Sequence, residues 1–445
     1  MYKPLLLVLC LVWTDFAQTG LREDIRRDSN YVRQLYEYLH ANPELSWAEQ
    51  ATAAHLANAL RELGFDVTPG VGGHGVVAVL RNGKGPTLAL RADMDALPVR
   101  ENTGLEYAST VTTSNDSGQT VAVMHACGHD VHMSVLVGSA RRLAAMQSTW
   151  QGTLLLIAQP AEEVGGGARA MLDDGLYQRF PRPDYNFALH VSADLAAGRI
   201  GYVAGYSMAN VDSVDIHVSG VGGHGAYPHL TKDPVVIAAQ IVMALQTIVS
   251  REISPLESAV ITVGSIHGGT KHNVISNGVD LQLTVRSYAD ETRNFLLRRI
   301  REISEGIALT NGLSGPLLPT VTVRDEYTPS VFNEPALVQR IAAHLSERLG
   351  AARLAQVPPV MAGEDFSRYA RVTPKIPSAL FWLGAVNPIL IEEAKASGQS
   401  LPSLHSAQFA PLPGPTLEAG IHAMTETALL LLGSPQREMI APPLR

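Results

Sequence analysis

The chain has 445 residues, of which 46% are hydrophobic and 17% are charged, with a formal net charge of -8. This composition is that of a globular protein and excludes a disordered chain, and the length is sufficient for two domains. The mild acidic excess offers no electrostatic attraction to nucleic acid or anionic membranes. We therefore expect neither as a partner of the mature protein.

The N-terminus carries a nine-residue apolar run, Leu5 to Trp13, just after Lys3. A membrane-spanning helix needs roughly 20 apolar residues, so this run fits the hydrophobic region of a secretory signal peptide better. We expect residues 1–19 to be a signal peptide and the mature protein to be exported, to the periplasm or beyond the cell. Signal removal takes Cys10 with it and leaves Cys127 as a lone thiol, either inert and buried or reactive.

From Tyr31 to about Ser192, helical and strand patterns alternate along the chain. Helices are predicted at 31–40, 47–63 and 132–146, and buried strands at 76–80, 87–91, 153–158 and 187–191. Such alternation predicts an α/β fold with a mainly parallel sheet covered on both faces. Ligands of such sheets gather at the carboxyl ends of the strands.

Three of these predicted strands run directly into side chains that can bind a metal or transfer a proton. The first leads to Asp93 and Asp95, the second to Glu162 and Glu163, and the third to His190. One such coincidence carries little weight, but three together predict a functional site at this edge of the sheet.

The section from about Ser207 to Thr320 has a different rhythm. The pattern begins with strand alternation, followed by a helix starting at Asp233-Pro234 and two further strands. A helix capped by Asp290 and a last short strand complete it. The order βαββαβ is the ferredoxin-like plan. We expect residues 207–320 to form an inserted domain, so that the main domain consists of residues 20–206 and 321–445.

Cys127 and His129 stand two positions apart, with Gly128 between them. In a helix this spacing separates the side chains by about 200 degrees, whereas in an extended segment both face one side. The glycine favours an extended or looping backbone. A thiolate and an imidazole on one side suit Zn, Mn, Co or Ni, although two residues alone do not make a site.

The adjacent carboxylates Glu162 and Glu163 repel each other unless a cation or a proton is near. In extended backbone they diverge, so that one can bind a metal while the other acts on water as a general base. The alternative is a solvated acidic start of a helix. Glu162-Glu163 alone does not decide between these interpretations.

Further histidines are candidate ligands only in combination. His190 at a strand end and His405 in the sequence LHS could complete a metal site, and His224 lies on a glycine-rich loop in the inserted domain. The run Gly165 to Gly167 lacks the lysine of a phosphate-binding loop, so we interpret it as a tight turn. No G-x-S-x-G elbow supports catalysis by serine.

In combination these residues resemble one family, the metal-dependent amidohydrolases that include hippurate hydrolase, bacterial N-acyl-amino-acid amidohydrolases and plant indoleacetyl-amino-acid hydrolases. They form a branch of the aminoacylase and glutamate carboxypeptidase superfamily. The similarity covers residues 33–432, and its motifs are HANPELSWAEQAT (40–52), LRADMDALPV (90–99), MHACGHDVH (124–132), QPAEEVGGGARAML (159–172), GGHGAYPHLTKDPV (222–235), NVIS (273–276), MAGEDF (361–366) and LHS (404–406).

The resemblance implies a site with two divalent metal ions, of Mn, Zn, Co or Ni. Its metal ligands would be Cys127, His129, Glu163, His190 and His405, with Cys127 bridging. Glu162 would be the general base, and Asp95 would hold a ligand imidazole. The inserted domain would be a lid and dimerisation domain, making the protein a homodimer. Its His224 would serve catalysis and substrate binding, and further substrate contacts would come from Asn273, Arg286 and Glu364.

Three functions follow, in order of preference. The first is an exported amidohydrolase that splits an N-acyl amino acid into a carboxylic acid and an amino acid. A dipeptidase or carboxypeptidase of the same superfamily would use the same chemistry on a peptide bond. An inactive metal- or amino-acid-binding protein is disfavoured because Glu162 is present. Ser276, where the family usually has proline, and Asn210, where serine is common, put the substrate in question rather than the reaction.

Overall fold

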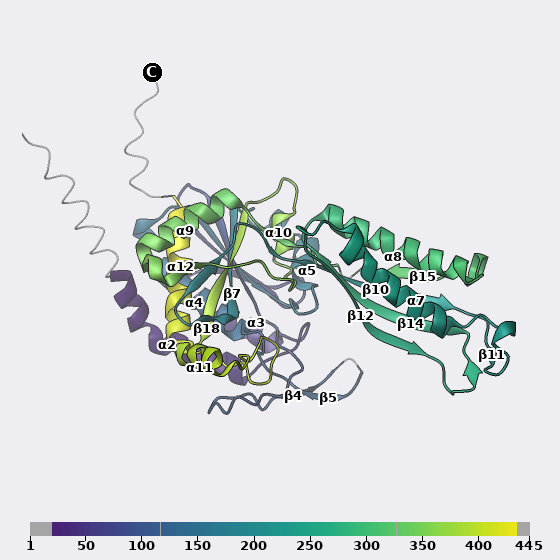
Figure 1. Ribbon diagram of the computed structural model, residues 1–445. Helices are drawn as coiled ribbons and strands as arrows, with labels where there is room; N and C mark the ends of the chain where they lie inside the picture. Colours follow the sequence, from purple (N-terminus) through teal and green to yellow (C-terminus); the bar gives the residue numbers. More distant parts are fainter. Residues whose placement is uncertain (1–19, 116, 326, 434–445) are drawn as a thin grey trace, which may run out of the picture. The chain divides into compact units, whose positions relative to one another are not determined.

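The computed structural model describes residues 20–115, 117–325 and 327–433 (Figure 1). The expected signal peptide, residues 1–19, lies outside the described residues. The chain divides into two compact units. The first contains the residues up to Gly205, Phe332–Pro358 and the residues from Arg368 onward; the second contains Tyr206–Val331 and Pro359–Ser367. The second unit extends past Thr320, because the strand that follows completes its sheet.

The first unit is built on an eight-stranded sheet whose four central strands are parallel neighbours. This agrees with the mainly parallel sheet predicted from the sequence. The spatial order is β1 (Asp66–Val71), β2 (Gly75–Asn82), β6 (Gly152–Gln159), β3 (Thr87–Asp93), β7 (Tyr185–Ala196), β18 (Ser378–Val386), β8 (Ile200–Tyr202) and β17 (Leu354–Gln356). The central strands are β6, β3, β7 and β18.

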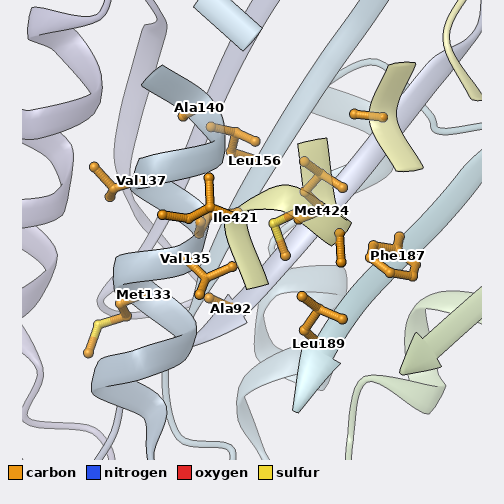
Figure 2. Packing of buried hydrophobic residues seen from close by; sticks show 14 of the residues in the cluster. Ala92, Met133, Val135, Val137, Ala140, Leu156, Phe187, Leu189, Ile421 and Met424 are labelled. Atoms are coloured by element: carbon orange, nitrogen blue, oxygen red, sulfur yellow. The ribbon is translucent and has the colours of Figure 1, made fainter. Parts of the chain in front are cut away.

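Helices complete the first unit, and several of them contribute buried residues to its main hydrophobic core. They are α2 (Ser29–Ala41), α3 (Gln50–Glu62), α4 (His129–Ala145), α5 (Gly167–Asp173), α6 (Leu176–Arg179), α9 (Pro335–Leu349), α11 (Pro388–Ser397) and α12 (Pro413–Leu431). Figure 2 shows α4 and α12 side by side against the sheet, with Val135 near Ile421 and with Met424 facing Phe187 and Leu189 of β7. Because α4 is buried on nearly all sides, the residues at its N-terminus are held firmly.

Glycine allows α4 and α12 to approach closely. A Cβ atom on Gly420 of α12 would lie 2.6 Å from Cγ2 of Val135 and 2.8 Å from Cδ2 of Leu383. Both neighbours are buried, so neither can move aside without disturbing the core.

The second unit has its own core and an antiparallel sheet in the order β12 (Ala259–Gly268), β14 (Gly278–Ser287), β10 (Asn210–Ser219) and β15 (Thr320–Val323). Helices α7 (Pro234–Thr247) and α8 (Asp290–Thr310) pack on this sheet through buried residues such as Ile241 and Leu296. Asp233 caps α7 as predicted, accepting a hydrogen bond from the amide of Val235. Asp290 is the first residue of α8 rather than its cap, which is Ala289.

Replacement of Gly420 by alanine should destabilise the protein, because overpacking a core typically costs about 1–3 kcal/mol. The matched control is Gly306→Ala in the middle of α8, where a Cβ meets nothing within 4 Å. There the better helix propensity of alanine should leave stability unchanged or raise it. Thermal and urea unfolding of both variants measure the difference. Equal effects of the two substitutions would contradict the close packing of α4 on α12.

Candidate metal centre

The predicted ligands come together in the first unit. Cys127 and His129 belong to the turn that enters α4, Glu163 to the turn after β6, His190 to β7, and His405 to a loop before α12. Candidate ligand atoms of Cys127, His129 and His190 lie within 4.8 Å of one another, and so do those of Cys127, Glu163 and His405. Residues nearly 280 positions apart in sequence are thus close enough to share bound ions.

Cys127 lies in a turn, in agreement with the extended or looping backbone predicted there, but His129 does not. His129 is the first residue of α4, so that helix begins three residues earlier than the periodicity indicated. Gly128 caps it with a positive φ of 77°, which glycine adopts without strain. A Cβ at this position would also lie 2.6 Å from Val191. The glycine therefore turns the chain so that the thiol and the imidazole face the same space.

The imidazole of His129 is oriented by its contact with the backbone. Nδ1 lies 2.8 Å from the carbonyl oxygen of Asp95, to which it donates when Nε2 is left as the ligand atom. Nε2 is buried without a hydrogen-bond partner in the structure, 3.8 Å from Oε1 of Glu163. A buried imidazole nitrogen without a hydrogen bond, beside a carboxylate oxygen, is suited to bind a metal ion.

His190 has the same arrangement. Its Nδ1 lies 2.8 Å from the carbonyl oxygen of Val191, and its Nε2 lies 3.7 Å from Sγ of Cys127. Burial holds the pKa of His190 well below its ordinary value, so the ring is neutral, as a ligand must be. We expected His190 to stand at the end of its strand, but β7 continues to Ala196. However, the pairing of β7 with β3 stops at Ala188, which frees the next residues on that side.

One carboxylate, Asp95, holds the turn that carries both glutamates. Its two oxygens accept hydrogen bonds from the amides of Glu162 and Glu163, each at 3.0 Å, and from the hydroxyl of Ser46 at 2.7 Å. These bonds fix the backbone of both glutamates beside the cluster. The two glutamates stand in a turn between β6 and α5, so they are not a solvated helix start.

Glu49 fixes the residue before the pair. Its carboxylate accepts a hydrogen bond of 2.7 Å from the amide of Ala161, and Ala161 has a positive φ of 49°. His405 is also left-handed, with a φ of 65°, and its Nε2 lies 3.4 Å from Oε2 of Glu163. Left-handed backbone at residues other than glycine costs about 1–3 kcal/mol and is concentrated at functional sites. Here it occurs at one candidate ligand, His405, and at Ala161, next to the candidate base.

The charges of the cluster call for a cation. Burial, reinforced by Glu163 and Glu162, raises the pKa of the Cys127 thiol well above its ordinary value, and burial raises the pKa of Glu163 to about 7. Neither group ionises easily here without a positive charge nearby. The unpaired Nε2 of His129 and Oε1 of Glu163, together with a thiol, three imidazoles and carboxylates, fit the borderline divalent metals.

Two residues of this network were not among the predicted site residues. Asp93 lies at the end of β3, and its carboxylate contacts Nδ1 of His132 at 2.5 Å and a nitrogen of Arg91 at 2.7 Å. Burial opposes its charge, but His129, His132 and Arg91 together hold the pKa of Asp93 well below its ordinary value. The signal was the spacing of Asp93 and Asp95, since alternate residues of a strand share a face, and that of His129 and His132, one helical turn apart.

The remaining predicted site residues belong to the second unit. His224 of β11 (Gly223–His224) and Asn273 are exposed, and the pairing of β11 with β13 (Val274–Ile275) brings their loops together. The guanidinium of Arg286 donates a 2.7 Å hydrogen bond to the carbonyl of Met361. Glu364, buried in the same returning segment, accepts one from the amide of Phe366. The structure thus places all four residues in the second unit, with His224 and Asn273 on neighbouring loops.

Comparison with known proteins identifies the family. Residues 89–397 match the model of peptidase family M20/M25/M40. The chain belongs to this family. It is 38% identical to thermostable carboxypeptidase 1 of Saccharolobus solfataricus over 82% of this chain and 89% of the relative. It is 36% identical to the hippurate hydrolase of Campylobacter jejuni over 76% of this chain and 85% of the relative.

A solved structure described as a dinuclear metal binding peptidase of the M20 family, from Bacillus subtilis, matches with a TM-score of 0.73 and 28% identity. The match covers 92% of this chain and 99% of that chain. The resemblance to metal-dependent amidohydrolases expected from the motifs is thereby confirmed, as is the prediction of an enzyme of this family. The α/β fold with a large, mostly parallel sheet is that of these structures.

Proposed function

We propose that this enzyme hydrolyses the amide bond of N-acyl amino acids, releasing a carboxylic acid and a free amino acid. The observation that carries the proposal is that overlapping groups of three side chains, each with its ligand atoms within 4.8 Å of one another, link all five ligand candidates and Glu162. That residue set, Cys127, His129, Glu163, His190 and His405, is suited to two divalent ions. The names of relatives, hippurate hydrolase among them, support an amide substrate of this small size.

When bound, the two ions would polarise the amide carbonyl and favour ionisation of a water molecule. The protein's own part is the transfer of protons. Glu162 takes a proton from the attacking water and then delivers it to the leaving nitrogen, so that the amine departs neutral. Asp95 holds the backbone of Glu162 by a 3.0 Å hydrogen bond. The base therefore keeps its position while its charge changes.

A carboxypeptidase or dipeptidase is the second candidate, because the S. solfataricus relative bears a carboxypeptidase name. The same centre would attack a peptide bond equally well, so only the substrate distinguishes the two functions. A binding protein without activity is disfavoured, since Glu162 is present and lies within 4.8 Å of ligand atoms of His129 and Glu163.

The adjacent glutamates offer a matched pair of variants. Glu162→Gln should lower kcat for N-acyl amino acids at least about 100-fold, the usual contribution of a general base, while metal content stays near that of the wild type. Glu163→Gln should instead lower metal content. The measurements are amine release from a panel of N-acyl amino acids and dipeptides, with Mn, Co or Zn added and after chelation, and metal analysis of each variant.

Three results would contradict this account. Release mainly from dipeptides would favour the peptidase. Full activity of Glu162→Gln would exclude it as the base. Tight metal binding with no turnover of any substrate in the panel would favour a binding protein.

We further propose that the second unit is a ferredoxin-like lid that contributes substrate contacts. Its element order is strand, helix, strand, strand, helix, strand. Arg286 supplies a permanent positive charge suited to the substrate carboxylate. His224 and Asn273 supply polar groups on paired, exposed loops, and Glu364 lies in the returning segment that Arg286 contacts.

We also propose that the protein is a homodimer formed through α7. Val236 and Met243 of this helix are 50% and 71% exposed, and with Val235, Ala239 and Ala244 they form an apolar surface. The opposite side of α7 packs on its own sheet through Ile237 and Ile241.

Among the described residues, Pro234–Glu252 is also the one helical segment apolar and long enough to span a membrane. However, α7 packs on its sheet, which fits a core helix whose outer side meets a partner.

Met243→Glu should shift the protein from dimer to monomer in sedimentation or light scattering, because a charge in the centre of an apolar interface is costly. Leu309→Glu is the control, since Leu309 is an exposed leucine on α8 of the same unit. A wild-type protein that is monomeric at all concentrations tested would refute the dimer.

Finally, we propose that the protein is exported through the signal peptide at residues 1–19, which lie outside the described residues. The support is the apolar run Leu5 to Trp13 after Lys3. Mass spectrometry of the protein recovered from a producing cell should find a mature N-terminus close to residue 20, outside the cytoplasm. An intact N-terminus on cytoplasmic protein would contradict export.

A further inference from the structure

A cavity of about 510 Å³ lies beside the metal centre in the first unit. Glu163 is one of its lining residues, as are Val164 and Ser46, whose hydroxyl donates to Asp95. The cavity therefore borders the reacting centre directly. Its other walls are the segment before α3, the residues after Asp95 and the strand β4 (Thr112–Ser114).

The walls of this cavity are mostly apolar, and among the described residues that line it there is no lysine, arginine or histidine. Its apolar lining includes Leu45, Trp47, Leu97, Val111 and Val123. The carboxylate of Glu44, at the rim, is already engaged by the backbone amides of Ala51 and Thr52 at 3.1 and 2.7 Å. Because the described residues of its walls are mostly apolar and offer no positively charged side chain to a carboxylate, the cavity favours an uncharged, apolar group.

Trp47 is the largest side chain of this wall and is held in an unusual way. Its backbone is left-handed, with a φ of 67°, and the residue is 47% exposed. Its indole ring lies against two glycines: a Cβ on Gly166 would be 2.7 Å from Cζ2, and one on Gly73 would be 3.6 Å from Cζ3. Strain of this kind persists only where the surrounding structure imposes it.

The glycine run after the glutamate pair thus has a function that a tight turn alone does not explain. Gly166 leaves room for the indole ring, whereas Gly167 lies so close to the carbonyl of Pro160 that a Cβ would be 1.6 Å from its oxygen. The run places the ring of Trp47 against the turn that carries Glu162 and Glu163. A rigid aromatic surface is thereby fixed next to the metal centre.

We infer that this cavity binds the acyl half of the substrate, and that the preferred acyl group is aromatic or similarly bulky and apolar rather than acetyl. The inference rests on the proposed function. An N-acyl amino acid carries its negative charge on the amino-acid half, for which these walls offer no positively charged side chain, whereas its acyl half is neutral and suits the apolar lining. A cavity of this volume is far larger than an acetyl group fills, and an aryl group would pack against the indole ring.

The test compares kcat/KM for N-benzoyl and N-acetyl derivatives of the same amino acid, using the metal-loaded full-length mature protein. The wild type should prefer the benzoyl substrate. Trp47→Ala should lower the benzoyl-to-acetyl ratio about tenfold, the scale on which an apolar contact discriminates between substrates, while Trp47→Phe should retain most of it. Val111→Phe, which fills the cavity from another wall, should lower the same ratio.

The control is Leu390→Ala, an exposed apolar residue on α11, which should leave the ratio unchanged. Because the readout is a ratio within each variant, partial loss of folded protein does not alter it. A wild type that prefers acetyl, or a ratio unchanged in both the Trp47 and the Val111 variants, would overturn the inference and leave the proposed function intact. Failure to hydrolyse any N-acyl amino acid would instead overturn the proposed function itself.

Discussion

The site depends on one electrostatic constraint: a thiol and several carboxylates are buried within a few ångströms of one another. Cys127, Glu162 and Glu163 crowd together where water is largely excluded, and burial there penalises every negative charge. Protons can relieve this repulsion, which is why the thiol and Glu163 hold theirs so readily. Divalent cations relieve it better, because each satisfies several ligands at once and releases those protons.

Backbone hydrogen bonds hold this arrangement in place, and several of its residues adopt a strained backbone. Asp95 and Glu49 are not in the cluster's ligand set, yet between them they bind three consecutive amides, from Ala161 to Glu163. Gly128 turns the chain between two ligands, and Ala161 and His405 adopt left-handed backbone. The parallel strands and the buried helix α4 provide the rigid base on which such strain can be maintained.

Most residues of the candidate site could be predicted from the sequence, some from local patterns and others only through resemblance to a family. Glu162 and Glu163 could be placed by elementary rules, because a buried strand visibly ends just before them. His405 could be assigned only through resemblance, since nothing in the local pattern ties it to residues so distant along the chain. His129 was placed in an extended or looping segment before the helix, because apolar periodicity begins later than the helix does and the left-handed Gly128 gives no periodic signal. Asp93 was noted only as a polar residue at the end of a strand, and His132 was not singled out, because their contact with each other exists only in the folded chain.

The cavity beside the site illustrates a different limit. Trp47, Gly166 and Val111 come from three separate segments, and each is unremarkable in its own sequence context. Only the folded chain shows that glycine was needed at position 166 to admit an indole ring. Substrate preference is therefore the property least accessible from the sequence, whereas the reaction follows from motifs that are local in sequence.

The most direct test of the two-metal account is a crystal structure of the metal-loaded protein with anomalous scattering measured at the absorption edge of the metal. The account predicts two peaks, roughly 3.5–4 Å apart, with Sγ of Cys127 bound to both and the remaining ligands drawn from His129, Glu163, His190 and His405. A single peak, or a pair of ions held without Cys127, would contradict it.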